Sequence, residues 1–227
     1  MSHPPADDSP AQGDQRTAWE ARYAESDRIW SGRVNTVLAD LAGDWPVGTA
    51  LDLGCGEGGD TVWLAGRGWH VTGVDLAANA VERTRRAAVQ AGVTDRVTVR
   101  QADLQDGIPD GDWDLVSAQF LQSFVAFDRG PALRAALAAL RPGGRLLVVD
   151  HAEAPPWAGR HHHGSEAAGG HRHGPADFPA PADTVAGLAL DPFFHEVELA
   201  EVRTRTATGP DGSTGTLKDG VVLVRRR

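Results

Sequence analysis

Hydrophobic and polar positions change their spacing along the chain, and each change predicts a different element. Between residues 16 and 41, apolar side chains recur three and four positions apart with a break at Ser31-Gly32, which predicts two short helices. From Thr49 onward, short β-rich runs alternate with helical stretches. This alternation is typical of a parallel sheet that helices cover.

The alternating region contains five predicted strands with helices between them. The strands are residues 50–53, 70–75, 97–103, 113–118 and 145–150, and the helices are residues 60–66, 77–90 and 131–140, the last ending at Arg141-Pro142-Gly143-Gly144. A further helix is expected over 182–190, followed by strands over 196–206 and 220–225 that predict an antiparallel hairpin. The predicted fold class is therefore α/β, a Rossmann-like, doubly wound, seven-stranded mixed sheet.

Composition divides the chain into three parts. Residues 1–14 are polar and rich in Pro, and we predict a disordered tail there. Residues 15–43 form the helical segment, and residues 44–227 form the main domain. Residues 153–182 of this domain are an insertion rich in His, Gly and Pro, which is too long for an ordinary connection.

Charge and cysteine content narrow the possible partners. The formal net charge of −9 argues against a nucleic-acid-binding protein, and the single cysteine, Cys55, excludes an internal disulfide. The N-terminus lacks the basic and apolar regions of a secretory leader, and no window approaches the roughly 18 apolar residues of a membrane helix. We therefore expect a cytoplasmic protein with a small-molecule substrate and neither a membrane nor a nucleic-acid partner. The sequence leaves the oligomeric state open.

The strongest local motif is a glycine-rich turn between a strand and a helix. Gly54, Gly56 and Gly59 fit G-x-G-x-x-G, and Asp75 ends the next predicted strand, where a carboxylate accepts hydrogen bonds from a ribose. This pattern alone fits an NAD(P)-dependent oxidoreductase as well as other nucleoside-binding enzymes. Asp52, inside the first strand, favours a ligand with a cationic group, because a pyrophosphate gains nothing from a nearby negative charge. Asp103, which ends the third strand, is placed to accept from a purine amine.

Five motifs in order resemble the class I S-adenosylmethionine-dependent methyltransferases. They are LDLGCGEG (51–58), GVDL (73–76), QADL (101–104), DWDLVSAQF (112–120) and LRPGGRLLVV (140–149). The predicted C-terminal hairpin is similar to the last two strands of that family. The resemblance implies methyl transfer from S-adenosylmethionine.

The resemblance also assigns cofactor-binding roles to individual residues. The methionine part lies against the glycine turn, the ribose binds the acid after the second strand, and the adenine amine binds the acid after the third. These roles fall on Gly54, Cys55, Gly56, Asp75, Leu76, Asp103 and Leu104, with Asp52 acting electrostatically on the methionine amino end and Cys55 a small packing residue.

The N-terminal segment looks like the lid helices of the tellurite-resistance and thiopurine or thiol methyltransferase branch. In that interpretation residues 15–43 form a lid, and Trp30 and Arg33 close over the cofactor, with the Arg33 guanidinium meeting the methionine carboxylate. The alternative is that Trp19, Tyr23 and Trp30 are the buried face of a packing helix.

The strand ends nearest the methyl group supply the acceptor-side candidates. We predict that Gln119 and His151 position the acceptor, and that Gln119 also lies near the cofactor. A soft nucleophile such as a thiol, a chalcogen oxyanion or a halide needs no base, whereas a hydroxyl does. His151 is therefore either a general base or a structural histidine.

A histidine cluster in the insertion is the remaining candidate site. The imidazoles can bind a divalent metal, and the candidate ligands are His161, His162, His163, His171 and His173. Two other functions stay open at this stage. One is a metal-binding or regulatory protein that uses the histidines, and the other is the oxidoreductase, which leaves Asp52, Asp103 and the hairpin unexplained.

Overall fold

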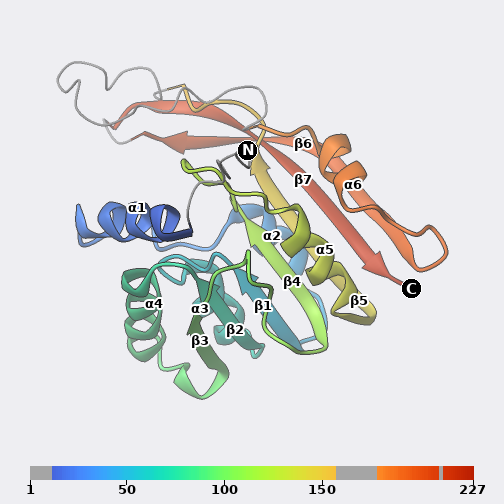
Figure 1. Ribbon diagram of the computed structural model, residues 1–227, viewed down its shortest axis with the longest axis horizontal. Coiled ribbons are helices and arrows are strands. Elements are labelled where there is room, and N and C mark those ends of the chain that lie inside the picture. Colours follow the sequence, from blue (N-terminus) through green and yellow to red (C-terminus); the bar gives the residue numbers. More distant parts are fainter. Residues whose placement is uncertain (1–11, 157–177, 210–211) are drawn as a thin grey trace, which may run out of the picture.

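Seven strands form one sheet in the order β3-β2-β1-β4-β5-β7-β6 (Figure 1). The strands are β1 (Thr49–Leu53), β2 (His70–Asp75), β3 (Val97–Gln101), β4 (Trp113–Gln119), β5 (Leu140–His151), β6 (His195–Thr208) and β7 (Thr214–Arg226). Strands β1 to β5 pair in parallel, whereas β7 is antiparallel to both β5 and β6. The predicted fold class, a mostly parallel Rossmann-like sheet with an antiparallel C-terminal hairpin, is confirmed.

The computed structural model describes residues 12–156, 178–209 and 212–227. Within these ranges the α-helices are α1 (Gln12–Ala24), α2 (Thr36–Ala42), α3 (Gly59–Gly66), α4 (Ala78–Gln90), α5 (Gly130–Ala138) and α6 (Pro181–Gly187), with a 3₁₀ turn, η1, at Thr94–Arg96. None of these helices has the length and apolar content that a membrane span needs.

The central strands are buried on both faces, so their sequences are almost continuously apolar. One face of the sheet packs against α2 and α3 through Leu38, Leu64 and Trp69. The other face packs against α5 and the end of α6 through Leu133 and Leu188. The strand order reverses between β1 and β4, and the carboxyl ends of open parallel sheets bind ligands at this kind of switch point.

The N-terminal helix begins earlier than predicted. The predicted disordered tail extends to residue 14, but α1 starts at Gln12. Low apolar content does not stop a helix from extending once its later turns are packed, because each added residue gains a hydrogen bond. Residues 1–11 of the predicted tail, and residues 157–177 of the histidine-rich insertion, lie outside the described residues.

Two further boundaries correct the sequence-based prediction. Residues 141–144, expected to end a helix, belong to β5, which starts at Leu140 opposite Trp113. The register then shifts, and Gly143 takes the left-handed conformation (φ 84°) that allows the strand to continue through this irregularity. The C-terminal hairpin is also longer than predicted, pairing from His195 opposite Arg226 to Thr208 opposite Thr214.

Candidate functional site

A cavity of about 850 Å³ opens at the carboxyl ends of the parallel strands. Its wall combines the loops that follow β1, β2, β3 and β4, the end of β5, part of β6 and the N-terminal segment. The wall therefore contains elements from both ends of the chain. One end of the cavity is built around the glycine turn, and we call it the cofactor end. The other is built around β4, β5 and β6, and we call it the acceptor end.

The glycine turn places backbone, without side chains, against the cavity. Gly54 and Gly56 have φ values of 71° and 54°, in the left-handed region that favours glycine. A Cβ on Gly56 would lie 3.3 Å from the Tyr23 hydroxyl and 3.4 Å from the Trp30 ring, so a larger residue would narrow the space under the N-terminal segment. Cys55, between these glycines, is buried, and its Sγ lies 3.8 Å from the Thr84 hydroxyl.

Two acids predicted to bind the nucleoside lie in the cavity wall. Asp75 lies beside the glycine turn, where its Oδ2 accepts a hydrogen bond of 3.0 Å from the Gly56 amide. Its Oδ1 accepts 2.9 Å from the Ala77 amide. Asp103 is held in the same way by the Gln105 amide at 2.9 Å. Each carboxylate is thus oriented by backbone and keeps lone pairs for a ligand, and the predicted flanking residues Leu76 and Leu104 also line the cavity.

The cofactor end is rich in buried carboxyl groups. Desolvation raises the pKa of Asp75 to about 6 and that of Asp60 to about 6, and both line the cavity. Asp52 is fully buried and is not part of the wall; it accepts 2.6 Å from the Thr61 hydroxyl, and desolvation raises its pKa to about 7. No ion pair in the described part of the chain involves these three groups. This end is therefore suited to a cationic ligand.

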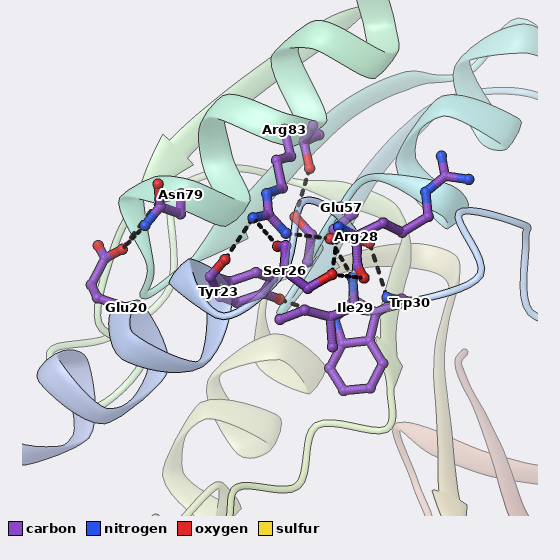
Figure 2. A network of polar contacts seen from close by, with 11 residues as sticks. Glu20, Tyr23, Ser26, Arg28, Ile29, Trp30, Glu57, Asn79 and Arg83 are labelled. Atoms are coloured by element: carbon purple, nitrogen blue, oxygen red, sulfur yellow. Dashed lines mark hydrogen bonds and ion pairs between the residues drawn. The ribbon is translucent and has the colours of Figure 1, made fainter. Parts of the chain in front are cut away.

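The N-terminal segment is fastened over the cofactor end by a buried ion pair (Figure 2). Arg83, on α4, donates at 2.6 Å to Glu57, which sits in the glycine turn. The other guanidinium nitrogen donates to the backbone oxygens of Tyr23 and Ser26, each at 2.6 Å. Glu57 in turn accepts from the backbone amides of Ile29 and Trp30, at 2.9 and 3.0 Å. The ion pair thus holds both sides of the loop that follows α1.

A second carboxylate joins α1 to α4. The first residue before α4 is Ala77, which has no side chain that can cap the helix. Glu20 replaces it: its carboxylate accepts from the Ala78 amide at 2.5 Å and from the Asn79 side chain at 3.0 Å (Figure 2). A negative charge there also faces the positive end of the helix dipole. Sequence patterns contain no signal for Glu20, Glu57 or Arg83, because their contacts join residues that are 26 to 60 positions apart.

The remaining predicted lid and strand-end residues differ in where they lie. Trp30 and Arg33 both line the cavity, and the Trp30 indole donates to the Tyr23 hydroxyl at 3.1 Å, although Trp30 is 47% exposed. Gln119 does not line the cavity: it is buried, and its amide donates at 2.8 Å to Ser117 on the same strand. Side chains two positions apart share a face of a strand, so Gln119 lies along the sheet.

The acceptor end begins where β4 leaves the sheet. Phe120 has a φ of 52°, a strained conformation for a large side chain, and it turns the chain into the cavity wall. Its ring stacks on the imidazole of His151 with centroids 4.3 Å apart. The guanidinium of Arg205, from β6, lies over the Phe120 ring, with its Cζ 5.7 Å from the ring centroid. His151 and Arg205 both line the cavity.

The predicted metal ligands all belong to the histidine-rich insertion. The five histidines, from His161 to His173, lie outside the described residues. Among the residues that are described, no group of three or more His, Cys, Asp or Glu side chains is arranged to hold a metal ion.

Comparisons with known proteins agree with this geometry. Residues 50–144 match a family model described as a methyltransferase domain. A 144-residue stretch is 38% identical to the 27-O-demethylrifamycin SV methyltransferase of Amycolatopsis mediterranei (strain S699), covering 60% of this chain and 52% of that protein. The chain spans about half or less of the length of such curated relatives.

Solved structures show the same fold at low identity. One, described as "Conversion of a Disulfide Bond into a Thioacetal Group during Echinomycin Biosynthesis", has a TM-score of 0.70 at 22% identity, covering 93% of this chain and 91% of the other. TehB from Haemophilus influenzae has a TM-score of 0.61 at 15% identity, covering 93% of this chain and 67% of its own. At these identities the likeness concerns the fold alone, so placement in the tellurite and thiol branch stays a prediction.

Proposed function

We propose that this chain, whose residues 50–144 are a methyltransferase domain, binds S-adenosylmethionine and transfers its methyl group to a small-molecule acceptor. The observation that carries the proposal is the composition of the cofactor end. A glycine turn, two backbone-held acids and a set of buried carboxyl groups without cationic partners meet in one cavity. A ligand that combines a nucleoside with positive charge satisfies all three features.

The residues in the wall fit the cofactor part by part. Asp75 would hold the ribose hydroxyls, Asp103 would accept from the adenine amine, and Leu76 and Leu104 would flank the ring. The turn at Gly54–Gly56 would lie along the methionine, and Arg33 would meet its carboxylate. The bound cofactor supplies an electrophilic methyl group on a sulfonium.

Buried negative charge supports this cofactor over a dinucleotide. Asp60 and Asp75 face the cavity and Asp52 lies beneath the turn, so a sulfonium and an ammonium there would be attracted, whereas a pyrophosphate would be repelled. At effective protein dielectric values, one such pair at about 4 Å is worth a few kcal/mol. The protein's own part in the reaction is to align the two reactants and exclude water, which supplies much of the rate in displacements of this kind.

The acceptor is proposed only as a small molecule. The cavity wall contains four carboxyl groups and two guanidinium groups, so it is not a basic groove, and the overall charge of −9 also disfavours nucleic acid. The acceptor classes predicted from sequence, a thiol, a chalcogen oxyanion or a halide, remain predictions, as do the divalent metal at the histidine-rich insertion and the cytoplasmic location.

Calorimetric titration of the metal-stripped protein tests the cofactor. S-adenosylmethionine and S-adenosylhomocysteine are expected to bind, and NAD⁺ is expected not to bind. NAD⁺ binding without the other two would overturn the proposal in favour of an oxidoreductase. If none of the three binds, a titration with Ni²⁺ and Zn²⁺ tests the metal-binding alternative.

A further inference from the structure

The acceptor end contains a pair of buried polar atoms that face each other without other partners. Nδ1 of His151 lies 3.4 Å from Oδ1 of Asp219. Both atoms are inaccessible to solvent, and neither has another hydrogen-bond partner in the described part of the chain. Leaving such groups unpaired costs about 1–3 kcal/mol each, so a small rotation that pairs them is favoured. Catalytic hydrogen bonds are often long before the substrate binds.

Strand pairing fixes this arrangement. His151, at the end of β5, is directly opposite Asp219 of β7 in the antiparallel register. On its other side, Asp219 is opposite Arg203 of β6, and Arg205 is the diagonal neighbour two residues along. Nε of Arg205 donates to the other oxygen of Asp219, Oδ2, at 2.5 Å. The carboxylate is 1% exposed, so both of its oxygens are committed to these two neighbours.

The backbone of His151 and its imidazole ring are each held by one further contact. The backbone amide of His151 donates at 3.0 Å to the Gln122 side chain, and the ring stacks on Phe120 at an interplanar angle of 25°. His151 lines the cavity, and its side chain is 30% exposed although Nδ1 is not. The solvent-accessible part of the ring is therefore the part away from Asp219. If Nδ1 carries the hydrogen toward Asp219, Nε2 keeps a lone pair for a ligand in the cavity.

Charge at this end is balanced within the protein. Burial alone would raise the pKa of Asp219, but hydrogen bonds from His151 and Arg205 and their charges lower it. The other charged side chains nearby are paired away from the imidazole, Arg129 with Asp150 and Lys218 with Glu153. Asp219 is thus an anion at neutral pH and stabilises the positive charge that His151 acquires when it takes a proton.

We propose that Asp219, held by Arg205, positions His151 to accept the proton of an acceptor O–H or N–H group. This inference rests on the proposed methyl transfer and names its substrate class. The acceptor oxygen or nitrogen forms a bond to the methyl carbon while the methyl–sulfur bond breaks and leaves its electron pair on sulfur. The acceptor's proton goes to Nε2 of His151. A thiolate or a halide needs no such base, so the pair would serve no purpose for those acceptors.

Matched probes that differ in one atom test the substrate class. Phenol and thiophenol, and benzyl alcohol and benzyl mercaptan, are incubated with methyl-labelled S-adenosylmethionine, and product is measured by mass spectrometry. We expect transfer to a hydroxyl probe to fall at least about 100-fold in His151→Gln, in line with the usual contribution of a general base. Any transfer to the thiol probes should change less than twofold.

Two further variants separate positioning from folding. Asp219→Asn keeps the size of the side chain and is expected to move the acidic limb of the pH–rate profile to lower pH, because the anion that favours the protonated imidazole is gone. Arg205→Gln should lower the rate, but the acidic limb of its pH–rate profile should shift no further than it does in Asp219→Asn. Arg203→Gln is the matched control: its guanidinium lies on the same strand but pairs with Glu201 at 2.7 Å, and we expect no change.

A measurement without any acceptor checks the geometry in the folded protein. In ¹⁵N-labelled protein, the His151 ring is expected to carry its hydrogen on Nδ1, and Asp219→Asn is expected to remove this preference. A hydrogen on Nε2 in the wild type would overturn the proposal. So would methylation of thiol probes alone, a hydroxyl rate that Asp219→Asn leaves unchanged at every pH, or no transfer to any hydroxyl probe while the protein binds S-adenosylmethionine. If S-adenosylmethionine does not bind at all, the proposed function fails instead.

Discussion

The two ends of the cavity are built on opposite principles. At the cofactor end, the chemistry comes from short segments at the ends of strands, and three buried carboxyl groups, Asp52, Asp60 and Asp75, form no ion pair in the described structure. At the acceptor end, His151, Asp219 and Arg205 come from three strands and neutralise one another. The first end needs a ligand to complete its charge, whereas the second is complete before a ligand arrives. Under the proposed function, this contrast means that the cofactor is bound by electrostatic attraction and the acceptor by shape and prearranged hydrogen bonding.

The largest expected effect concerns the attachment of the N-terminal segment, residues 12–33, to the rest of the molecule. Arg83→Met leaves Glu57 buried without its cation, and we expect this to cost about 3 kcal/mol because an unpaired buried charge is strongly destabilising. Hydrogen exchange in residues 12–33 should accelerate far more than exchange in β5 and β7.

Arg86→Met is the matched control for that experiment. Arg86 lies on the same helix, but it is 64% exposed and its ion pair with Glu82 is long, at 3.7 Å. Its removal should therefore change hydrogen exchange little. Equal acceleration in both variants, or acceleration that spreads to the C-terminal hairpin, would show that the two ends are not independent.

The next effect concerns the ribose contact. Asp75→Ala should weaken S-adenosylmethionine binding more than tenfold in calorimetry, because it removes charge-assisted hydrogen bonds to the ribose and the support of the Gly56 amide. Asp95→Ala is the control, since Asp95 is 67% exposed and outside the cavity. Unchanged affinity in Asp75→Ala would remove the ribose from this position.

The pH dependence of binding tests the charge contrast directly. The raised pKa values of Asp60 and Asp75, about 6, and of Asp52, about 7, mean that these groups lose protons as pH rises from 5 to 8. A cation binds best to the ionised form, so S-adenosylmethionine should bind about fivefold more tightly at pH 8 than at pH 5.

S-adenosylhomocysteine, which lacks the sulfonium charge, is the control ligand and should show a smaller increase. The stability of the unliganded protein has the opposite pH dependence: it falls as pH rises. Folded carboxyl groups with raised pKa values hold protons that the unfolded chain has lost, so they lower stability as pH rises from about 4 to 7. Equal pH dependence for both ligands would show that the carboxyl groups do not sense the sulfonium.

The smallest expected effect concerns the junction of α1 and α4. Glu20→Gln keeps hydrogen-bonding capacity but removes the negative charge at the start of α4, at an expected cost of about 0.5 kcal/mol. For a chain of this size that corresponds to a fall in Tm of about 1–2 °C. Glu82→Gln, an exposed change on the same helix, should leave Tm unaltered, and a larger fall there than in Glu20→Gln would contradict the capping role.

The difference between the two ends also explains what the sequence could predict. Asp75 and Asp103 follow strands with clear β-rich patterns, and a glycine turn between a strand and a helix has a recognisable spacing, so these positions were accessible from one chain. The mostly parallel sheet with its antiparallel C-terminal hairpin was predicted from the same alternation. Local sequence determines both, because each residue's role depends on neighbours a few positions away.

Long-range pairing was not accessible in this way. Asp219 meets His151 only because β7 inserts beside β5 in one register, and a shift by a single residue would turn the carboxylate to the other face. Gln119 is a position where the sequence pattern was misleading. It ends a strand, as a ligand-contacting residue would, yet its amide donates to Ser117 along the sheet. Burial and register decide such cases, and a single sequence contains neither.

The only cysteine of the chain is Cys55, buried in the glycine turn, where desolvation raises the pKa of its thiol well above the usual range. The thiolate is the form that attacks alkylating reagents, so this residue will react slowly with maleimides in the folded protein. The natural chain is therefore a ready background for site-specific labelling. A cysteine placed at an exposed position such as Ser26 can carry a fluorophore that reports any movement of the N-terminal segment, without removal of a native thiol.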